Sequence, residues 1–143
     1  ISAGASYTGF YNEYSATDKS LPELQWSAEA NATIGYSFTK AGLDANLFYK
    51  ATGKQPSYVL SGQDVVLSEL KGYQMADFTI NKHFNKTVLR YFTISAGIRN
   101  LFDVTHVNSN VAVTGGIHTG DGGRNLAYGR SYFAGLVFNW NKK

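Results

Sequence analysis

A run of fourteen residues, Gln25 to Phe38 (QWSAEANATIGYSF), alternates between polar and apolar positions without an exception. Trp26, Ile34 and Phe38 belong to the apolar set. Successive side chains of a β-strand leave opposite faces of the pleat, whereas an amphipathic helix repeats its apolar residues every three or four positions. The run therefore predicts a strand with one apolar and one wet face, and it excludes a helix.

The same period of two recurs along the chain and predicts an all-β antiparallel fold. Segments rich in Gly, Pro, Ser and Asp separate the alternating runs and predict turns and loops. One of these connections contains an apolar patch, VVLSEL, which could form a short strand or a packed loop. The six predicted strands are residues 1–12, 25–38, 43–51, 73–84, 92–102 and 131–140.

Composition narrows the classes of function. The 143 residues include ten Tyr, nine Phe, two Trp and fifteen Gly but no Cys, so disulfides and thiolate metal sites are excluded. The formal net charge is +3 and the basic residues are scattered, which gives nucleic-acid binding no support. The sequence starts at Ile1 without a basic-then-apolar leader, and we interpret it as a mature protein or, preferably, a piece of a larger one.

Strand length and loop length both indicate a transmembrane β-barrel. The predicted strands run for about 10 to 14 residues, which matches a tilted bilayer crossing better than the usual globular strand. Connections of roughly four and seven residues alternate with connections of about a dozen, twenty and more, as in barrels with short periplasmic turns and long outer loops. No run of about 18 apolar residues is present, so a transmembrane helix is excluded.

The positions of the aromatic and charged residues also fit a transmembrane β-barrel. Charged residues within the predicted strands lie on the polar phase and would face a wet lumen, as Glu29, Asp44, Lys50, Asp77 and Arg99 do. Lys82 is the exception, and it would either snorkel to the headgroups or sit beside a bulge that shifts the phase. Aromatic residues near the strand ends predict two interfacial girdles. The girdle residues are Trp26, Phe38, Tyr73, Phe84, Tyr132 and Trp140.

Alternation alone does not decide which face is wet. A soluble lipocalin-like barrel would turn the same apolar faces inward. The long strands, the two girdles and the unequal loops favour the membrane. Membrane barrels start at about eight strands, and open edges are prohibitive in lipid. We therefore expect the six strands to pair with another chain or to be the C-terminal part of one barrel.

Two motifs carry a resemblance to a known family. The stretch GIRNLFDVT is similar to the G-x-x-NLFD pattern on the penultimate strand of TonB-dependent outer-membrane receptors, and GRSYFAGLVFNW resembles their final strand. Trp140 takes the place of the late aromatic that serves barrel assembly, but residues 141–143 follow it, whereas many family members stop there. The residues that match the first pattern are Gly97, Asn100, Leu101, Phe102 and Asp103.

The resemblance implies a plugged barrel of about 22 strands in the outer membrane of a Gram-negative bacterium. Residues 1–143 would supply its last six strands, without the N-terminal plug. The implied partners are lipid, the remaining barrel and plug, the TonB complex and a surface-exposed lipoprotein. The implied activity is energised uptake of a scarce, bulky ligand. Because AYGRSYF replaces the Pro-Arg-Thr-like step usual in SusC-like glycan importers, we favour a haem, siderophore or cobalamin type, with no resident cofactor.

The predicted outer loop 103–130 holds the candidate ligand-binding residues. His106 and His118 could be haem or metal ligands, although solvated loop histidines are commoner, and Asp121, Arg124 and Tyr128 could contact a polar ligand or a surface partner. The Gly-rich run does not fit a phosphate-binding loop, and no G-x-S-x-G elbow occurs. We therefore predict no catalytic residue, no metal site and no enzyme. A passive porin is the nearest alternative.

Overall fold

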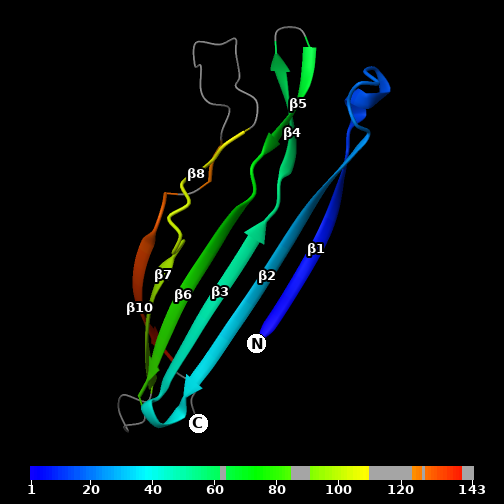
Figure 1. The fold of residues 1–143 in the computed structure, drawn as a ribbon. Coiled ribbons are helices and arrows are strands. Elements are labelled where there is room, and N and C mark those ends of the chain that lie inside the picture. Colours follow the sequence, from blue (N-terminus) through cyan, green and yellow to red (C-terminus); the bar gives the residue numbers. More distant parts are fainter. Residues whose placement is uncertain (62–63, 85–90, 110–123, 127, 140–143) are drawn as a thin grey trace.

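The computed structural model describes residues 1–61, 64–84, 91–109, 124–126 and 128–139. Six long strands form one antiparallel sheet in the order β1-β2-β3-β6-β7-β10 (Figure 1). Each strand pairs with the long strand that precedes or follows it along the chain, so the sheet is a meander. Its strands are β1 (Ser2–Tyr11), β2 (Leu24–Phe38), β3 (Leu43–Thr52), β6 (Tyr73–His83), β7 (Phe92–Arg99) and β10 (Ser131–Phe138).

The alternating runs gave the strands and most of their limits correctly. The one large difference is the fifth predicted strand, 92–102, which ends at Arg99 instead. Asn100 and Asp103 take the left-handed backbone conformation, with φ of 54° and 57°. Among residues with a side chain, Asn and Asp enter this region most readily, and it cannot continue a strand. The NLFD motif is therefore a turn after the strand.

The long connections contain structure of their own and gather at one end of the sheet (Figure 1). The apolar patch VVLSEL lies in β5 (Asp64–Leu70), which forms a hairpin with β4 (Gln55–Ser61). The predicted loop 103–130 contains β8 (His106–Val107) paired with β9 (Arg124–Asn125). The short 3-10 turns are η1 (Glu13–Ala16) after β1 and η2 (Thr39–Ala41) between β2 and β3.

Hydrogen bonds tie these connections to one another. Asn12, which is 2% exposed, donates from Nδ2 to the Pro22 carbonyl at 3.1 Å, and its Oδ1 accepts from the Tyr14 amide at 3.1 Å. The Lys71 amide donates to the Asn108 carbonyl at 2.9 Å, which joins the β4–β5 hairpin to the segment after β8. Polar contacts therefore order this end of the molecule.

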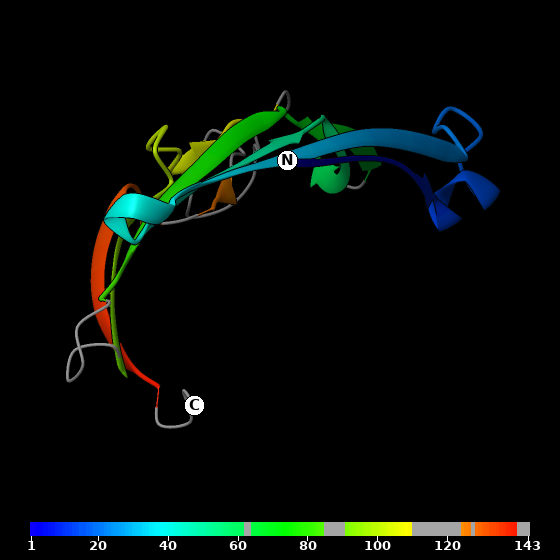
Figure 2. The same cartoon turned by 90° about the horizontal axis from the view of Figure 1, so that it is seen from below.

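The sheet is a single layer that bends into an open arc (Figure 2). Among the described residues, Ala76 and Val107 are the only buried hydrophobic ones. The accessible surface is 10290 Å² for a mass of 15.7 kDa. A compact monomer of that mass would expose about 7,300 Å². The described chain has no hydrophobic core, and the stability of its sheet must come from surroundings that cover its apolar side chains.

Candidate functional site

One face of the sheet presents large apolar side chains to the surroundings. The register places them in a single phase on neighbouring strands, so that Ile34 lies beside Leu47, and Ile94 beside Leu136. Soluble monomers rarely expose apolar patches beyond a few hundred Å². Exposed members of this face are Tyr7, Tyr11, Leu24, Trp26, Ile34, Tyr36, Phe38, Leu47, Ile94, Tyr132, Leu136 and Phe138, from 37% to 71% exposed.

Aromatic rings pair at both ends of this apolar face. Near the long connections, Tyr7 stacks on Trp26 with ring centroids 5.0 Å apart. Near the short turns, the centroids of Tyr36 and Phe38 are 4.5 Å apart, and Phe92 and Phe138 are 5.1 Å apart. Tyr7, Trp26 and Tyr36 can hold a polar O–H or N–H group in water while their ring bodies contact a nonpolar medium, and the phenylalanine rings add apolar surface beside them.

The predicted girdle residues fall into three groups. Trp26, Phe38 and Tyr132 belong to the apolar face, and Phe84 follows β6 in the same phase. Tyr73 departs from them, because it pairs with Thr52 and so lies in the opposite phase. Its position near a strand end suited a girdle, but an odd-numbered residue of β6 faces the polar side. Trp140 lies outside the described residues.

Lys82 is a cation in the apolar phase near the short-turn end. It pairs with Leu43 on one side and Ile94 on the other in an unbroken register, so no bulge shifts the phase there. Its amine donates a hydrogen bond to the Ala41 carbonyl and lies 5.7 Å from the centroid of the Phe84 ring. The side chain therefore reaches the end of the sheet, as the snorkelling alternative requires.

The opposite face carries most of the charged side chains of the six long strands, and two pairs of them are in contact. Lys50 Nζ lies 3.2 Å from Glu29 Oε1. His83 Nε2 lies 2.8 Å from Asp44 Oδ2, and its Nδ1 lies 3.1 Å from Thr93 Oγ1, so this side chain links three strands. These charged side chains are 32% to 39% exposed, less than most of the large apolar ones opposite. Such crowding favours the polar face as the concave side of the arc.

Gly97, the first motif residue, lies under an aromatic ring on the polar face. A Cβ at this position would lie 2.6 Å from Phe133 on the neighbouring strand and 2.5 Å from the Phe78 carbonyl oxygen. The Phe133 ring also lies 5.2 Å from the Arg99 guanidinium carbon. An aromatic ring that covers a strand glycine restores packing that the glycine itself lacks. The glycine of the motif therefore makes room for Phe133.

Asn100 holds the turn that follows β7. It is 3% exposed, and its side chain makes two hydrogen bonds to Val104: Nδ2 donates to the carbonyl at 2.9 Å and Oδ1 accepts from the amide at 3.0 Å. The Asn100 amide donates to Asp77 Oδ1 at 2.8 Å, and the Leu101 amide donates to the Ala76 carbonyl at 2.7 Å. These bonds fasten the turn to itself and to β6.

Asp103 and Arg130 connect this turn to the start of β10. Asp103 Oδ1 accepts from the Arg130 amide at 2.7 Å. The Arg130 guanidinium donates from Nε and Nη2 to the Leu101 carbonyl, at 3.1 and 2.6 Å. Gly129 has φ of 89°, and a Cβ there would lie 2.8 Å from Asp103 Oδ1. We call residues 100–103 with Gly129 and Arg130 the clasp. Phe102 projects from it, 54% exposed, with its ring 6.4 Å from Tyr49.

The predicted ligand residues are only partly placed. His106 lies in β8, where its Nδ1 is 3.0 Å from Asn125 Oδ1. Tyr128 is fully exposed, and with Thr105, Asn125 and Leu126 it lines a hollow of about 440 Å³. Arg124 pairs with Val107 through the backbone of β9. His118 and Asp121 lie outside the described residues. The described part of the chain brings no three His, Asp or Glu side chains together in a way that could hold a metal ion.

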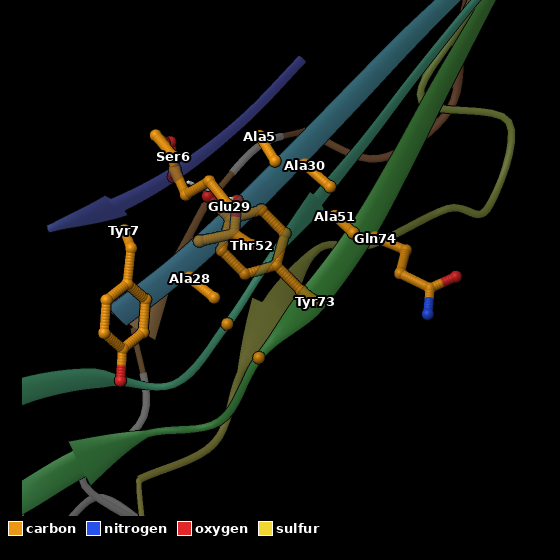
Figure 3. A pocket seen from close by; sticks show the side chains of 12 residues that line it. Ala5, Ser6, Tyr7, Ala28, Glu29, Ala30, Ala51, Thr52, Tyr73 and Gln74 are labelled. Atoms are coloured by element: carbon orange, nitrogen blue, oxygen red, sulfur yellow. Dashed lines mark hydrogen bonds between the residues drawn. The ribbon is translucent and has the colours of Figure 1, made fainter. Parts of the chain in front are cut away.

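A larger hollow, of about 700 Å³, crosses β1, β2, β3 and β6. Ala5, Ala30 and Ala51 lie in a row that ends at Gln74, because these residues pair in turn across the sheet (Figure 3). Short side chains leave the surface low there, beside the taller Tyr7 ring. The described residues that line it are Ala5, Ser6, Tyr7, Ala28, Glu29, Ala30, Ala51, Thr52, Gly53, Gly72, Tyr73 and Gln74.

No helix in the described ranges is long and apolar enough to cross a membrane. Comparison of the chain with protein-family models, with curated proteins and with solved structures gave no significant match. The function is therefore inferred from the geometry and chemistry of the chain itself.

Proposed function

We propose that this chain is the C-terminal six-stranded part of an outer-membrane β-barrel of the TonB-dependent receptor type. The observation that carries the proposal is the single-layer sheet with one exposed apolar face, aromatic rings at both ends of that face, and paired charges on the other. Lipid covers such an apolar face without a second layer of protein, and a wet lumen accepts the charges. The convex side of the arc would contact lipid.

The edges of the sheet support further strands. In the described residues, β1 pairs with β2 alone and β10 pairs with β7 alone, so each has a row of unpaired backbone groups. An unpaired amide or carbonyl in hydrocarbon costs several kcal/mol, because no water is present to bond it. In the proposed barrel, strands beyond these edges complete the hydrogen bonding.

The receptor class rests on the motif resemblance together with the clasp. Gly97 lies under Phe133, and within the clasp Asn100, Leu101 and Asp103 each take part in hydrogen bonds, so four residues of the motif have a structural role. We propose that the whole receptor takes up a ligand of haem, siderophore or cobalamin type, driven by the TonB complex. A passive porin shares the sheet chemistry and is the second candidate.

Spin labels on adjacent residues test the membrane face. The chain has no cysteine, so single cysteines at Thr33 and Ile34 can be labelled in the intact protein in lipid vesicles. These neighbours lie in opposite phases of β2. We expect the label at Ile34 to be relaxed by oxygen, which enters lipid, and the label at Thr33 by a water-soluble nickel chelate. In a soluble lipocalin-like barrel, the label at Ile34 would be shielded from both, and that result would refute the membrane face.

Uptake assays separate the receptor from the porin. Cells that depend on haem, a siderophore or cobalamin should need both this protein and TonB to grow at limiting ligand. Small-solute passage that continues without TonB would instead identify a porin.

A further inference from the structure

The final strand needs something besides its side-chain pattern to fix its register. β10 pairs with β7 so that Ser131 lies opposite Arg99 and Ala134 opposite Ala96. Because side chains alternate with a period of two, a slip by two residues would keep every apolar side chain on the apolar face. A short hairpin loop fixes register by its length, but residues 100–130 separate these two strands.

The clasp supplies that constraint. Arg130 immediately precedes β10, and both its backbone amide and its guanidinium are bonded to the turn that immediately follows β7. The turn is itself held to β6 through Asp77 and Ala76. The start of β10 is therefore attached at a fixed position to two earlier strands, through residues at the two ends of the long loop.

Gly129 explains why Arg130, and not a residue two positions away, is bonded to Asp103. Its φ of 89° belongs to the region that favours glycine, and the space for a Cβ is occupied by the Asp103 carboxylate. A two-residue slip would bring Ser131 or Ala127 to this position, and each has a Cβ. The slipped registers would thus lose the Asp103 contact and meet a steric conflict.

We infer that the clasp is a register lock, in which Asp103, Arg130 and Gly129 select the native pairing of the last strand against two-residue slips. In the barrel proposed above, that register sets the height at which the free edge of β10 meets the closing strand. Its importance for closure rests on the proposed function, but the lock itself is a property of the β7–β10 pair.

Disulfide trapping measures the register directly. Cysteines at Ala96 and Ala134 report the native pairing, as do cysteines at Ser95 and Gly135. In an antiparallel ladder, directly opposite residues alternate between hydrogen-bonded pairs and non-hydrogen-bonded pairs, and the Cα atoms are closer in the second kind. One of the two cysteine pairs therefore has the shorter distance for a disulfide. Cysteine at Ala96 with cysteine at Tyr132 or Leu136 reports a slip of two residues in either direction.

The expected result is native links in the otherwise unaltered intact protein and a mixture in D103A. Loss of the charge-assisted bond should lower the ratio of native to slipped links by about tenfold. G129A should shift the ratio in the same direction, whereas D103N keeps an acceptor oxygen and should stay close to the original ratio. A G135A variant, whose added Cβ meets nothing within 4 Å, controls for the replacement of a glycine by alanine in the same part of the chain.

Unchanged native links in D103A and in G129A would overturn the lock. If D103A does not fold, G129A alone decides, and a native ratio there has the same meaning. Either outcome leaves the spin-label test of the membrane face unaffected, so failure of the lock and failure of the proposed function are distinguishable.

Discussion

Two buried asparagines organise the connections at the long-loop end of this sheet. Asn12 and Asn100 follow β1 and β7, are 2% and 3% exposed, and bond main-chain groups through both side-chain atoms. An amide side chain has both a donor and an acceptor, so it can stand in for a backbone pair where a strand has ended. Neither a carboxylate nor an apolar side chain can make both bonds.

Asn100→Asp should therefore destabilise the protein, although the two side chains have nearly the same size and shape. The substitution removes the donor to the Val104 carbonyl and sets two oxygens against each other, with an expected cost of about 1 to 3 kcal/mol. The measurement is the free energy of unfolding from a urea titration in detergent micelles, followed by tryptophan fluorescence. Asn31→Asp, on an exposed residue of the polar face opposite Lys50, is the matched control and should be almost neutral. Equal effects of the two variants would contradict this role for Asn100.

Gly97→Ala should destabilise more than Gly135→Ala. The two glycines lie on neighbouring strands in the same phase, but an added Cβ meets Phe133 and a carbonyl oxygen at the first position and nothing within 4 Å at the second. Overpacking of this kind costs about 1 to 3 kcal/mol. The same urea titration measures the difference. If the two alanine variants unfolded at the same urea concentration, the space under Phe133 would have no energetic importance.

Among the strands, the alternation of faces decides what each position tolerates. Ile34→Lys places a charge on the apolar face of β2, whereas Thr33→Lys places it on the polar face, opposite Ser2 and Phe48. In lipid the first substitution should cost about 2 to 4 kcal/mol and the second much less. Folding yield and unfolding free energy in lipid vesicles measure both. A Thr33→Lys variant that failed as badly as Ile34→Lys would contradict the assignment of the faces.

The strands also show that the polar face is connected across the sheet. His83 on β6 bonds Asp44 on β3 and Thr93 on β7, and Lys50 on β3 pairs with Glu29 on β2. These pairs are partly exposed, so each contributes little to stability by itself. Their effect is to satisfy charges on the side that we propose to face the lumen.

At the scale of the whole molecule, the open sheet has surfaces that favour association with other molecules in water. Its apolar face lacks a covering layer in the described residues, and both its edges offer backbone groups for pairing. Long, exposed apolar edge strands are sites of association. We expect residues 1–143, produced alone, to associate in buffer and to disperse when detergent is added. Sedimentation velocity with and without detergent measures this, and a stable, water-soluble monomer would refute the membrane assignment.

The sequence alone determined the strands and their two faces, because the period of two is a local property of the pleat. It also marked Gly97, Asn100 and Asp103 as a group, although it placed Asn100 on the fifth strand and not in the turn that follows it. The tertiary structure decided where that strand ends, since the left-handed Asn100 is held by Asp77 and Val104. It also decided that Arg130 meets Asp103 and that Phe133 covers Gly97. These contacts join residues far apart in the chain, and no local pattern specifies them.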